Sequence, residues 1–206
     1  MSNVIRVEPK PKTCVALIRG INVGRAKRVA MADLRQLFSG LGYRHATTLL
    51  NSGNVVFVDD TGETTQQISA KLESAFASRI GFSARIIVLT AVELRSVVEA
   101  DPLSHVATEP SRYLVAFLDS SDWSAPVKQL AGQDWTPEIL ATGPRAVYAW
   151  CPNGISGGRL AEELNRTLKD SSTARNWASV TKLLKLAEQI ENSPSSSSLS
   201  SSLSSD

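Results

Sequence analysis

The order of the expected strands and helices constrains the fold of this chain more than any other feature. Between Thr13 and Leu89, short runs of β-branched and apolar residues alternate with stretches of helical period in the order β-α-β-β-α-β. This is the order of a ferredoxin-like unit. A closely similar order begins again at Arg112. We therefore predict an α+β protein with duplicated ferredoxin-like (βαββαβ) lobes, antiparallel sheets and an extra C-terminal helix.

Local signals place the elements of the first lobe. The expected strands are Thr13–Ile18, Thr47–Leu50, Asn54–Val58 and Ala84–Leu89. Met31–Leu41 has helical period, and Thr64 with Gln67 forms a capping box that opens the next helix. Asn51–Gly53 supplies turn residues that tolerate positive φ, so the second and third strands are expected to form a hairpin.

The second half of the chain carries similar signals. Thr90 and Glu93 form another capping box, which opens a short helix that ends before Pro102 and closes the first lobe. Beyond it we expect strands at Arg112–Leu118, Ile139–Ala141 and Ala146–Trp150, and helices at Ser124–Leu130, Arg159–Leu168 and Trp177–Ile190. The predicted divisions are a flexible arm (1–12), a first lobe (13–100), a linker (101–111), a second lobe (112–191) and a disordered tail (192–206). The tail contains ten serines and cannot build a core.

Composition excludes several classes of protein. The chain has 206 residues, of which 42% are hydrophobic, as in ordinary soluble globular proteins. Its longest apolar runs are six residues, whereas a membrane span needs about twenty, so we expect no membrane segment. Residues 1–12 have no apolar secretory stretch, and we expect a cytoplasmic location. Two cysteines and two histidines are too few for a disulfide scaffold or zinc cluster, so we expect no metal and no cofactor.

Charge is unevenly distributed along the chain, although the net charge is only +2. From Lys10 to Ala32 there are six cations and no acid, and from Ser171 to Ala187 there are three cations and no acid. From Leu89 to Leu140 there are eight acids and three cations. If the two basic segments meet in space, they would favour an anionic partner. The alternative is that these segments are solvated faces of unrelated elements.

Three segments carry glycine and polar residues that packing alone does not require. They supply the candidate ligand-binding residues, which are Arg19, Gly20, Asn22 and Gly24 after the first strand, Ser52 and Asn54 in the hairpin, and Arg175, Asn176 and Trp177 at the start of the last helix. A glycine-rich loop turns successive N–H groups toward an anion, and a helix N-terminus does the same. Arginine forks suit phosphate or carboxylate, and an indole ring stacks on bases.

These residue types predict a binding protein with an anionic ligand in a cleft between the lobes. Arg19 and Arg175 would pair with the anion, Asn22 and Asn54 would orient it, and Trp177 would stack on it. The ligand would be a nucleotide, a phosphorylated metabolite or nucleic acid. Each segment also has a structural interpretation, as a turn, a helix cap or core packing. The hypothesis therefore depends on whether the three segments converge.

Two other functions stay open at this point, as does the oligomeric state. An enzyme acting on a phosphorylated or carboxylated small molecule would need a general base, and only Asp33 or Asp170 could serve, through burial and a raised pKa. Gly154–Gly158 fits the G-x-S-x-G pattern of a nucleophile elbow, but no histidine follows it in the chain. A scaffold or homodimer would instead use Arg19 and Arg175 in internal ion pairs and expose a large apolar face.

The same segments resemble a bacterial family known as domain of unknown function 1697 (DUF1697). The resemblance rests on Val15–Gly24, Ser52–Phe57, Gly143 with Arg145–Tyr148, and Thr173–Trp177 with Val180, Lys182 and Leu183. It extends from Val15 to about Leu186 and implies a duplicated ferredoxin-like α+β fold. The family usually has glycine where Arg25 stands and proline where Ala30 stands. The family has no assigned reaction, so the resemblance implies a fold and no chemistry.

Overall fold

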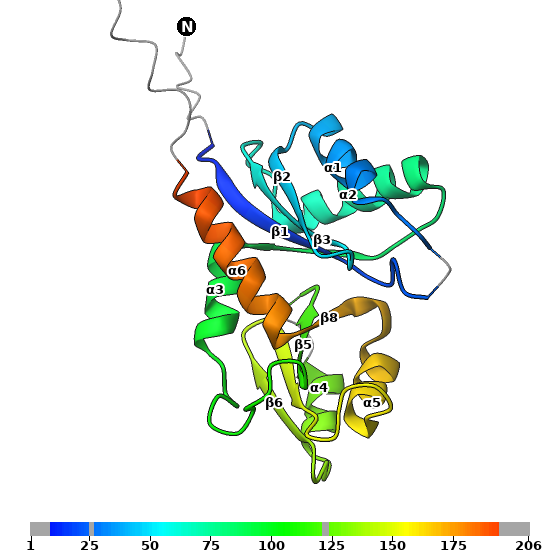
Figure 1. Ribbon diagram of the computed structural model, residues 1–206, viewed down its shortest axis with the longest axis vertical. Coiled ribbons are helices and arrows are strands. Elements are labelled where there is room, and N and C mark those ends of the chain that lie inside the picture. The colour runs from blue at the N-terminus through cyan, green and yellow to red at the C-terminus, as the bar shows by residue number, and fades with distance from the viewer. Residues whose placement is uncertain (1–8, 25–26, 121–123, 194–206) are drawn as a thin grey trace, which may run out of the picture.

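The computed structural model describes residues 9–24, 27–120 and 124–193. These residues form two lobes, one above the other in Figure 1, and each lobe contains a four-stranded antiparallel sheet. The arm predicted for 1–12 and the tail predicted for 192–206 lie mostly outside the described residues. Lys12 is already part of the first strand, so that strand begins one residue before the predicted lobe boundary.

The first lobe has the predicted βαββαβ order. Its elements are β1 (Lys12–Ile18), α1 (Met31–Gly40), β2 (Arg44–Leu49), β3 (Asn54–Asp59), α2 (Thr65–Ile80) and β4 (Ile86–Thr90). The strands lie in the order β2-β3-β1-β4, with β1 central. One face of the sheet packs against α1 and α2, through a core that includes Cys14, Phe38, Phe57 and Phe76.

The second lobe repeats this arrangement. Its elements are β5 (Tyr113–Leu118), α4 (Ser124–Ala131), β6 (Ile139–Gly143), β7 (Ala146–Trp150), α5 (Arg159–Leu168), a 3-10 turn (Lys169–Ser171) and β8 (Ser172–Asn176). The strand order β6-β7-β5-β8 matches that of the first sheet position by position. The α+β fold with repeated βαββαβ lobes and a C-terminal helix is therefore confirmed.

β8 is the one strand that the sequence analysis missed. The last helix begins at Trp177, as predicted, but the residues just before it, Ser172–Asn176, pair with β5 as a strand that was not expected. The segment reads S-T-A-R-N, with no apolar alternation to indicate a strand. Its buried residues are the polar Ser172 and Thr173, so tertiary pairing rather than local pattern makes it a strand.

Each sheet is followed in the chain by one helix, and these two helices pack together. α3 (Ala91–Glu99) follows β4, and α6 (Trp177–Glu191) follows β8, so each lobe ends in a helix and the C-terminal helix has a counterpart in the first half. The two helices contact each other, and Arg95 of α3 forms ion pairs with Glu188 and Glu191 of α6. Figure 1 shows both helices along one side of the molecule, beside the space between the sheets.

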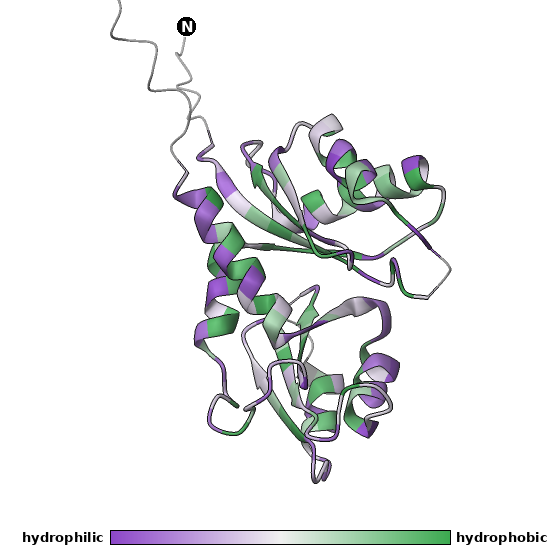
Figure 2. Ribbon diagram, in the orientation of Figure 1, coloured by the Kyte–Doolittle hydropathy of each residue, from purple (hydrophilic) through white to green (hydrophobic). Residues whose placement is uncertain are grey.

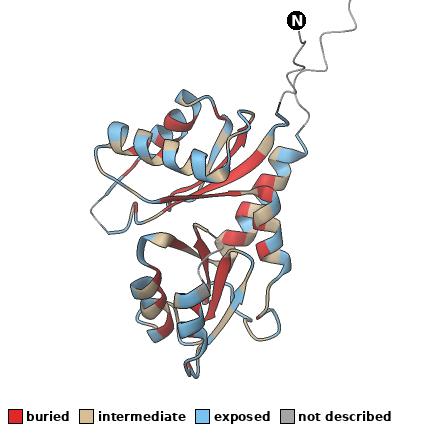
Figure 3. Ribbon diagram, turned by 180° about the vertical axis from the view of Figure 1, so that it is seen from behind, coloured by how far each residue is buried: buried red, intermediate tan, exposed pale blue. Residues whose placement is uncertain are grey.

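The inner faces of both sheets pack with α3 and α6 into one central core. Val15 and Leu17 contribute from β1, and Tyr113 and Tyr148 contribute from the second sheet. Because the sheets are covered on both faces, β1 is buried along nearly its whole length, as are β3 and β7. Figure 3 shows these strands and the inner side of α6 as buried, and Figure 2 shows α6 with alternating apolar and polar residues.

Local chemistry explains the element boundaries that position the site. Both predicted capping boxes are present, with Thr64 and Gln67 at α2 and Thr90 and Glu93 at α3. The β2–β3 turn needs Gly53, whose φ is +75° and where a Cβ would lie 2.9 Å from Ile21 Cγ1. Among the described residues, no helix is both long enough and apolar enough to cross a membrane.

Candidate functional site

Arg175 on β8 lies between the lobes, with its donor groups directed into the first lobe. Its Nε donates to Asn54 Oδ1 at 2.5 Å, and its Nη2 donates to the carbonyls of Ile18 at 2.9 Å and Ser52 at 3.1 Å. Its Nη1 donates to Thr173 Oγ1 and to the Ala174 carbonyl in its own lobe. The structure thus brings Arg175, Asn54 and Ser52 together, in a cross-lobe hydrogen-bonded cluster.

The charge of Arg175 is not balanced by a carboxylate. Within the described part of the chain, all of its hydrogen-bond partners are neutral carbonyl, amide or hydroxyl oxygens. Desolvation by the surrounding protein, with a smaller contribution from the like charge of Arg19, lowers the pKa of Arg175 to about 10. The guanidinium is still charged at neutral pH and leaves a positive potential at the junction of the lobes.

Arg19, directly after β1, also reaches into the second lobe. Its Nη1 donates to the Ser172 carbonyl at 2.7 Å, and its Nη2 donates to Asn165 Oδ1. Its Nε lies 3.7 Å from Asp170, whose side chain is 89% exposed. Arg19 therefore contacts β8, the 3-10 turn and α5 through polar and charged groups, and it keeps part of its surface open to solvent.

The remaining polar candidates have local structural roles. Asn22, at φ +57°, exchanges hydrogen bonds with the backbone of Val29 and donates to the Asn51 carbonyl, which fixes the loop before α1. Asn54 also donates to Ser52 Oγ, and Asn176 caps α6 by accepting from the backbone of Ser179. These side chains hold the backbone and do not line the groove described below.

The last three candidates, Trp177, Gly20 and Gly24, lie in surroundings that differ from one another. The Trp177 ring stacks on Tyr113, with centroids 5.0 Å apart and planes 29° apart, and packs against the central core. Gly20 and Gly24 both adopt positive φ. Gly20 lines the groove, and Gly24 is an exposed residue of the same loop. Thus the sequence pattern identified one side of the candidate site, Arg19 with Gly20, and a set of residues that support it.

An open groove of about 520 Å³ lies between the lobes beside Arg19. Its described lining comes from the β1–α1 loop, the middle of α2, the α2–β4 loop and the 3-10 turn, namely Arg19, Gly20, Lys27, Glu73, Ser83, Ala84, Arg85, Asp170 and Ser171. The backbone N–H of Arg19 donates to the Arg85 carbonyl at 2.9 Å, which sets these two arginines side by side. Three cations and two acids therefore line the groove, with Arg175 enclosed nearby.

Sequence reasoning missed Lys27, Glu73 and Arg85. Lys27 belongs to the basic run that the charge pattern singled out, but nothing local distinguishes it from its neighbours. Arg85 precedes β4 and forms ion pairs with Glu73 at 3.2 Å and with Asp119 of the second lobe at 2.8 Å. The hydrogen bond that Arg85 donates to the Asp119 carboxylate is the main cause that raises the pKa of Arg85. The ion pair with Asp119 forms only when the two lobes pack together, so no local sequence pattern indicates it.

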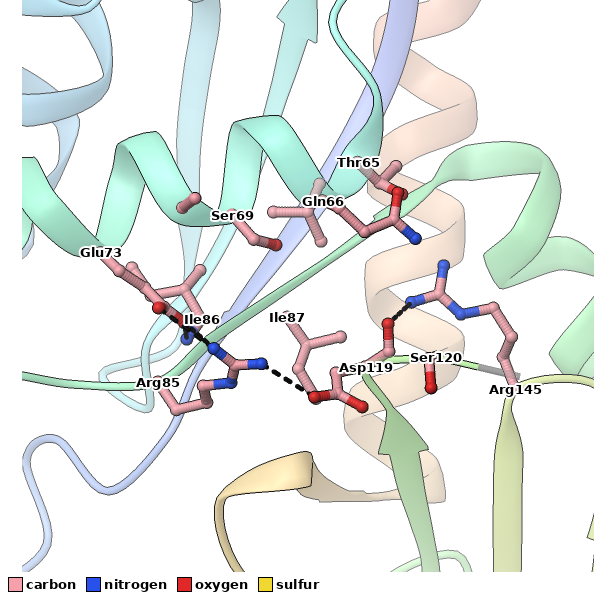
Figure 4. A pocket seen from close by; sticks show the side chains of 12 residues that line it. Thr65, Gln66, Ser69, Glu73, Arg85, Ile86, Ile87, Asp119, Ser120 and Arg145 are labelled. Atoms are coloured by element: carbon pink, nitrogen blue, oxygen red, sulfur yellow. Dashed lines mark hydrogen bonds and ion pairs between the residues drawn. The ribbon is translucent and has the colours of Figure 1, made fainter. Parts of the chain in front are cut away.

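A second cavity of about 350 Å³ adjoins the groove, since Arg85 and Glu73 line both. It lies between the first turns of α2 and the loop after β5 (Figure 4). Arg145, before β7, lines its far side and forms an ion pair with Glu93 at 2.6 Å. Thr65, Gln66 and Ser69 of α2 line it from above.

The two carboxylates considered as general bases are exposed, and the two cysteines are buried. Asp170 lies at the rim of the groove but is highly exposed, and Asp33 is an exposed residue of α1, so neither is buried as a general base would have to be. Burial raises the pKa of the thiols of both Cys14 and Cys151 to about 12, so neither is a thiolate at neutral pH. Within the described ranges, no three His, Cys, Asp or Glu side chains are grouped to hold a metal ion.

Two similar lobes joined by a pair of helices, with an arginine-lined groove at their junction, define the chain as a two-lobed α+β protein. It belongs to the family described as "Protein of unknown function (DUF1697)", which matches residues 12–148. The resemblance predicted from the sequence is thereby confirmed. None of the curated proteins matches the chain.

A solved structure has the same fold. The conserved bacterial protein SP0830 from Streptococcus pneumoniae superposes with a TM-score of 0.73 at 23% sequence identity. The similarity covers 86% of this chain and 99% of that protein. At this level of identity, the comparison supports the fold and carries no information on ligand or reaction.

Proposed function

We propose that this protein binds a small anionic molecule, of the phosphorylated-metabolite or nucleotide class, in the groove between its lobes. The observation that carries the proposal is the set of cations at this junction. Arg19, Lys27 and Arg85 line the groove, and the Arg175 guanidinium is enclosed beside it without a carboxylate among its described partners. Desolvation is the main cause that lowers the pKa of Arg175, and the like charge of Arg19 adds a smaller repulsion. An anion beside Arg19 would relieve that repulsion.

In this proposal, the ligand-binding residues predicted from the sequence take different roles from those first expected. Arg19 would contact the anion directly, and the loop at Gly20 would let it approach the backbone. Arg175 would act through its charge and by holding the lobes together, because its donor groups are occupied. Asn22, Asn54 and Asn176 would support the loop, the hairpin and α6.

Size and charge favour a small molecule over nucleic acid. The volume of about 520 Å³ falls within the range of ligand pockets, roughly 300–1,000 Å³. Glu73 and Asp170 interrupt the cations of the groove, whereas a nucleic-acid surface presents a continuous basic stripe. A scaffold with an apolar face is less well supported, because the exposed large apolar side chains among the described residues, Val23, Leu50, Val92 and Ile139, come from separate elements.

Titration calorimetry with inorganic phosphate and pyrophosphate tests the proposal, on the full chain at two salt concentrations. We expect saturable binding that weakens with salt. Arg19→Gln should raise Kd about tenfold, since a hydrogen bond to a charged group contributes about 1.5–3 kcal/mol. Lys27→Gln, at an exposed position, should also raise Kd and leaves the cross-lobe contacts intact.

The matched control is Lys182→Gln, which removes an exposed cation on α6, away from the groove. It should leave Kd unchanged. The proposal is wrong if neither anion binds, or if the Lys182 and Lys27 variants weaken binding equally, because the attraction would then be that of the overall charge.

A further inference from the structure

The cavity next to the groove differs from it in electrostatic character. Its described charged residues are two cations, Arg85 and Arg145, and two acids, Glu73 and Asp119. Both arginines are already paired, Arg85 with Glu73 and Asp119, and Arg145 with Glu93. A second anion placed there would lie against carboxylates that already neutralise these arginines. The cavity therefore suits an uncharged group.

The other polar groups of this cavity offer hydrogen bonds of both kinds. Gln66 and Ser69 extend from the first turns of α2 toward the space between Arg85 and Arg145 (Figure 4). The Gln66 carboxamide provides a donor and an acceptor, and the Ser69 hydroxyl provides the same. The carboxylates of Glu73 and Asp119 are acceptors. The lining also includes the apolar side chains of Ala70 and Ile87.

The two cavities adjoin at shared lining residues. Arg85 and Glu73 line both, so a ligand that contacts Arg85 from the groove lies next to the neighbouring space. Arg85 is held by acids from both lobes, and its position is therefore fixed when the lobes are docked. The groove thus offers a cationic end and the second cavity a polar end without net charge, with Arg85 between them.

From this juxtaposition we propose that the site takes a phosphomonoester whose uncharged, hydroxyl- or amide-bearing part occupies the cavity formed by Gln66, Ser69 and Arg145. This inference rests on the proposed function, because it assigns the phosphate to the groove beside Arg19. Sugar phosphates and nucleoside monophosphates share the required chemistry. Ala70, an exposed apolar residue of the lining, would contact the carbon skeleton of the ligand, and the polar groups of the lining would bond its hydroxyl or amide groups.

Calorimetry with inorganic phosphate, ribose 5-phosphate and adenosine 5′-monophosphate tests the inference on the full chain. The two esters should bind more tightly than inorganic phosphate. Whichever ester binds more tightly shows whether the uncharged part is that of a sugar phosphate or of a nucleoside monophosphate. The double variant Gln66→Ala with Ser69→Ala should weaken the tighter ester about tenfold, as expected for two lost hydrogen bonds. It should leave the Kd of inorganic phosphate unchanged.

Ser74→Ala is the matched control, because Ser74 is an exposed residue of the same helix and does not line either cavity. It should change none of the three affinities. If phosphate binds but the esters bind no more tightly, or if the double variant weakens phosphate and ester equally, the inference is wrong and the anion groove stands. If none of the three compounds binds, the proposed function fails, and the inference fails with it.

Discussion

Arg175 joins the two lobes through the hydrogen bonds of a single side chain. Five N–H groups in a planar fork reach acceptors on β1, on the β2–β3 turn and on β8 itself. A lysine has one nitrogen and three donors, so it would leave several of these oxygens without a partner. The segment that carries Arg175 could be recognised from sequence as polar and unusual, but its partners in the first lobe could not be, because they lie more than a hundred residues away in the chain.

Replacement of Arg175 should lower the stability of the whole protein. Arg175→Lys keeps the charge but loses part of the hydrogen bonding, and we expect a loss of about 2 kcal/mol. Arg175→Met removes the charge and leaves the Ile18 and Ser52 carbonyls unsatisfied, so the loss should be larger, about 3–5 kcal/mol. Urea denaturation of both variants checks this order, with Lys182→Gln as a surface control. A Met variant as stable as the native protein would mean that the enclosed charge costs as much as its bonds contribute.

At the scale of elements, the sequence predicted helix starts and turns correctly where residues close together in the chain determine them. The capping boxes at Thr64 and Thr90 and the hairpin turn at Gly53 follow from short-range preferences. β8 was missed because its pairing with β5 involves residues about sixty positions apart, and because its inward residues are polar. Elements that depend on distant partners leave little trace in their own sequence.

The N-cap of α3 should contribute measurably to stability, because this helix joins β4 to the central core. Thr90→Ala removes the hydroxyl that accepts from the Glu93 backbone, and we expect a loss of about 1 kcal/mol. The N-cap of α1, Ala30, is exposed and makes no side-chain hydrogen bond, so Ala30→Ser should instead raise stability by about 0.5–1 kcal/mol. Thermal unfolding of the two variants should shift in opposite directions. Shifts of the same sign would show that tertiary contacts, and not the caps, determine both helix ends.

For the whole molecule, the groove exists only because the lobes dock. Arg85 comes from the first lobe and Asp119 from the second, and Arg145 reaches back from the second lobe to Glu93 on α3. No spacing rule links these residues, whereas Arg19 and Gly20 could be identified from a glycine-rich loop after a strand. The sequence therefore predicted one wall of the candidate site, and the opposite wall depends on the packing of two sheets and two helices.

The Glu93–Arg145 contact should make the docking of the lobes sensitive to acid. Burial disfavours the charged form of Glu93, but hydrogen bonds from Thr90 and Arg145 outweigh it and lower the pKa of Glu93 below its ordinary value of 4.5. Because the folded-state pKa lies below the unfolded one, the stabilisation is complete above about pH 4.5 and is lost as the pH falls through the folded-state pKa. Glu93→Gln retains a capping-box residue and removes only the charge.

Urea midpoints measured between pH 7 and pH 3 test this expectation. The Gln variant should be less stable than the native protein at neutral pH, and the two curves should approach each other as the pH falls below 4.5, because protonation of Glu93 then produces the same loss. Glu99→Gln, at an exposed position on the same helix, should run parallel to the native protein. A constant difference between the Glu93 variant and the native protein at every pH would mean that Arg145 is held by its bonds to the Leu118 and Asp119 carbonyls, and that the carboxylate charge plays no part in joining the lobes.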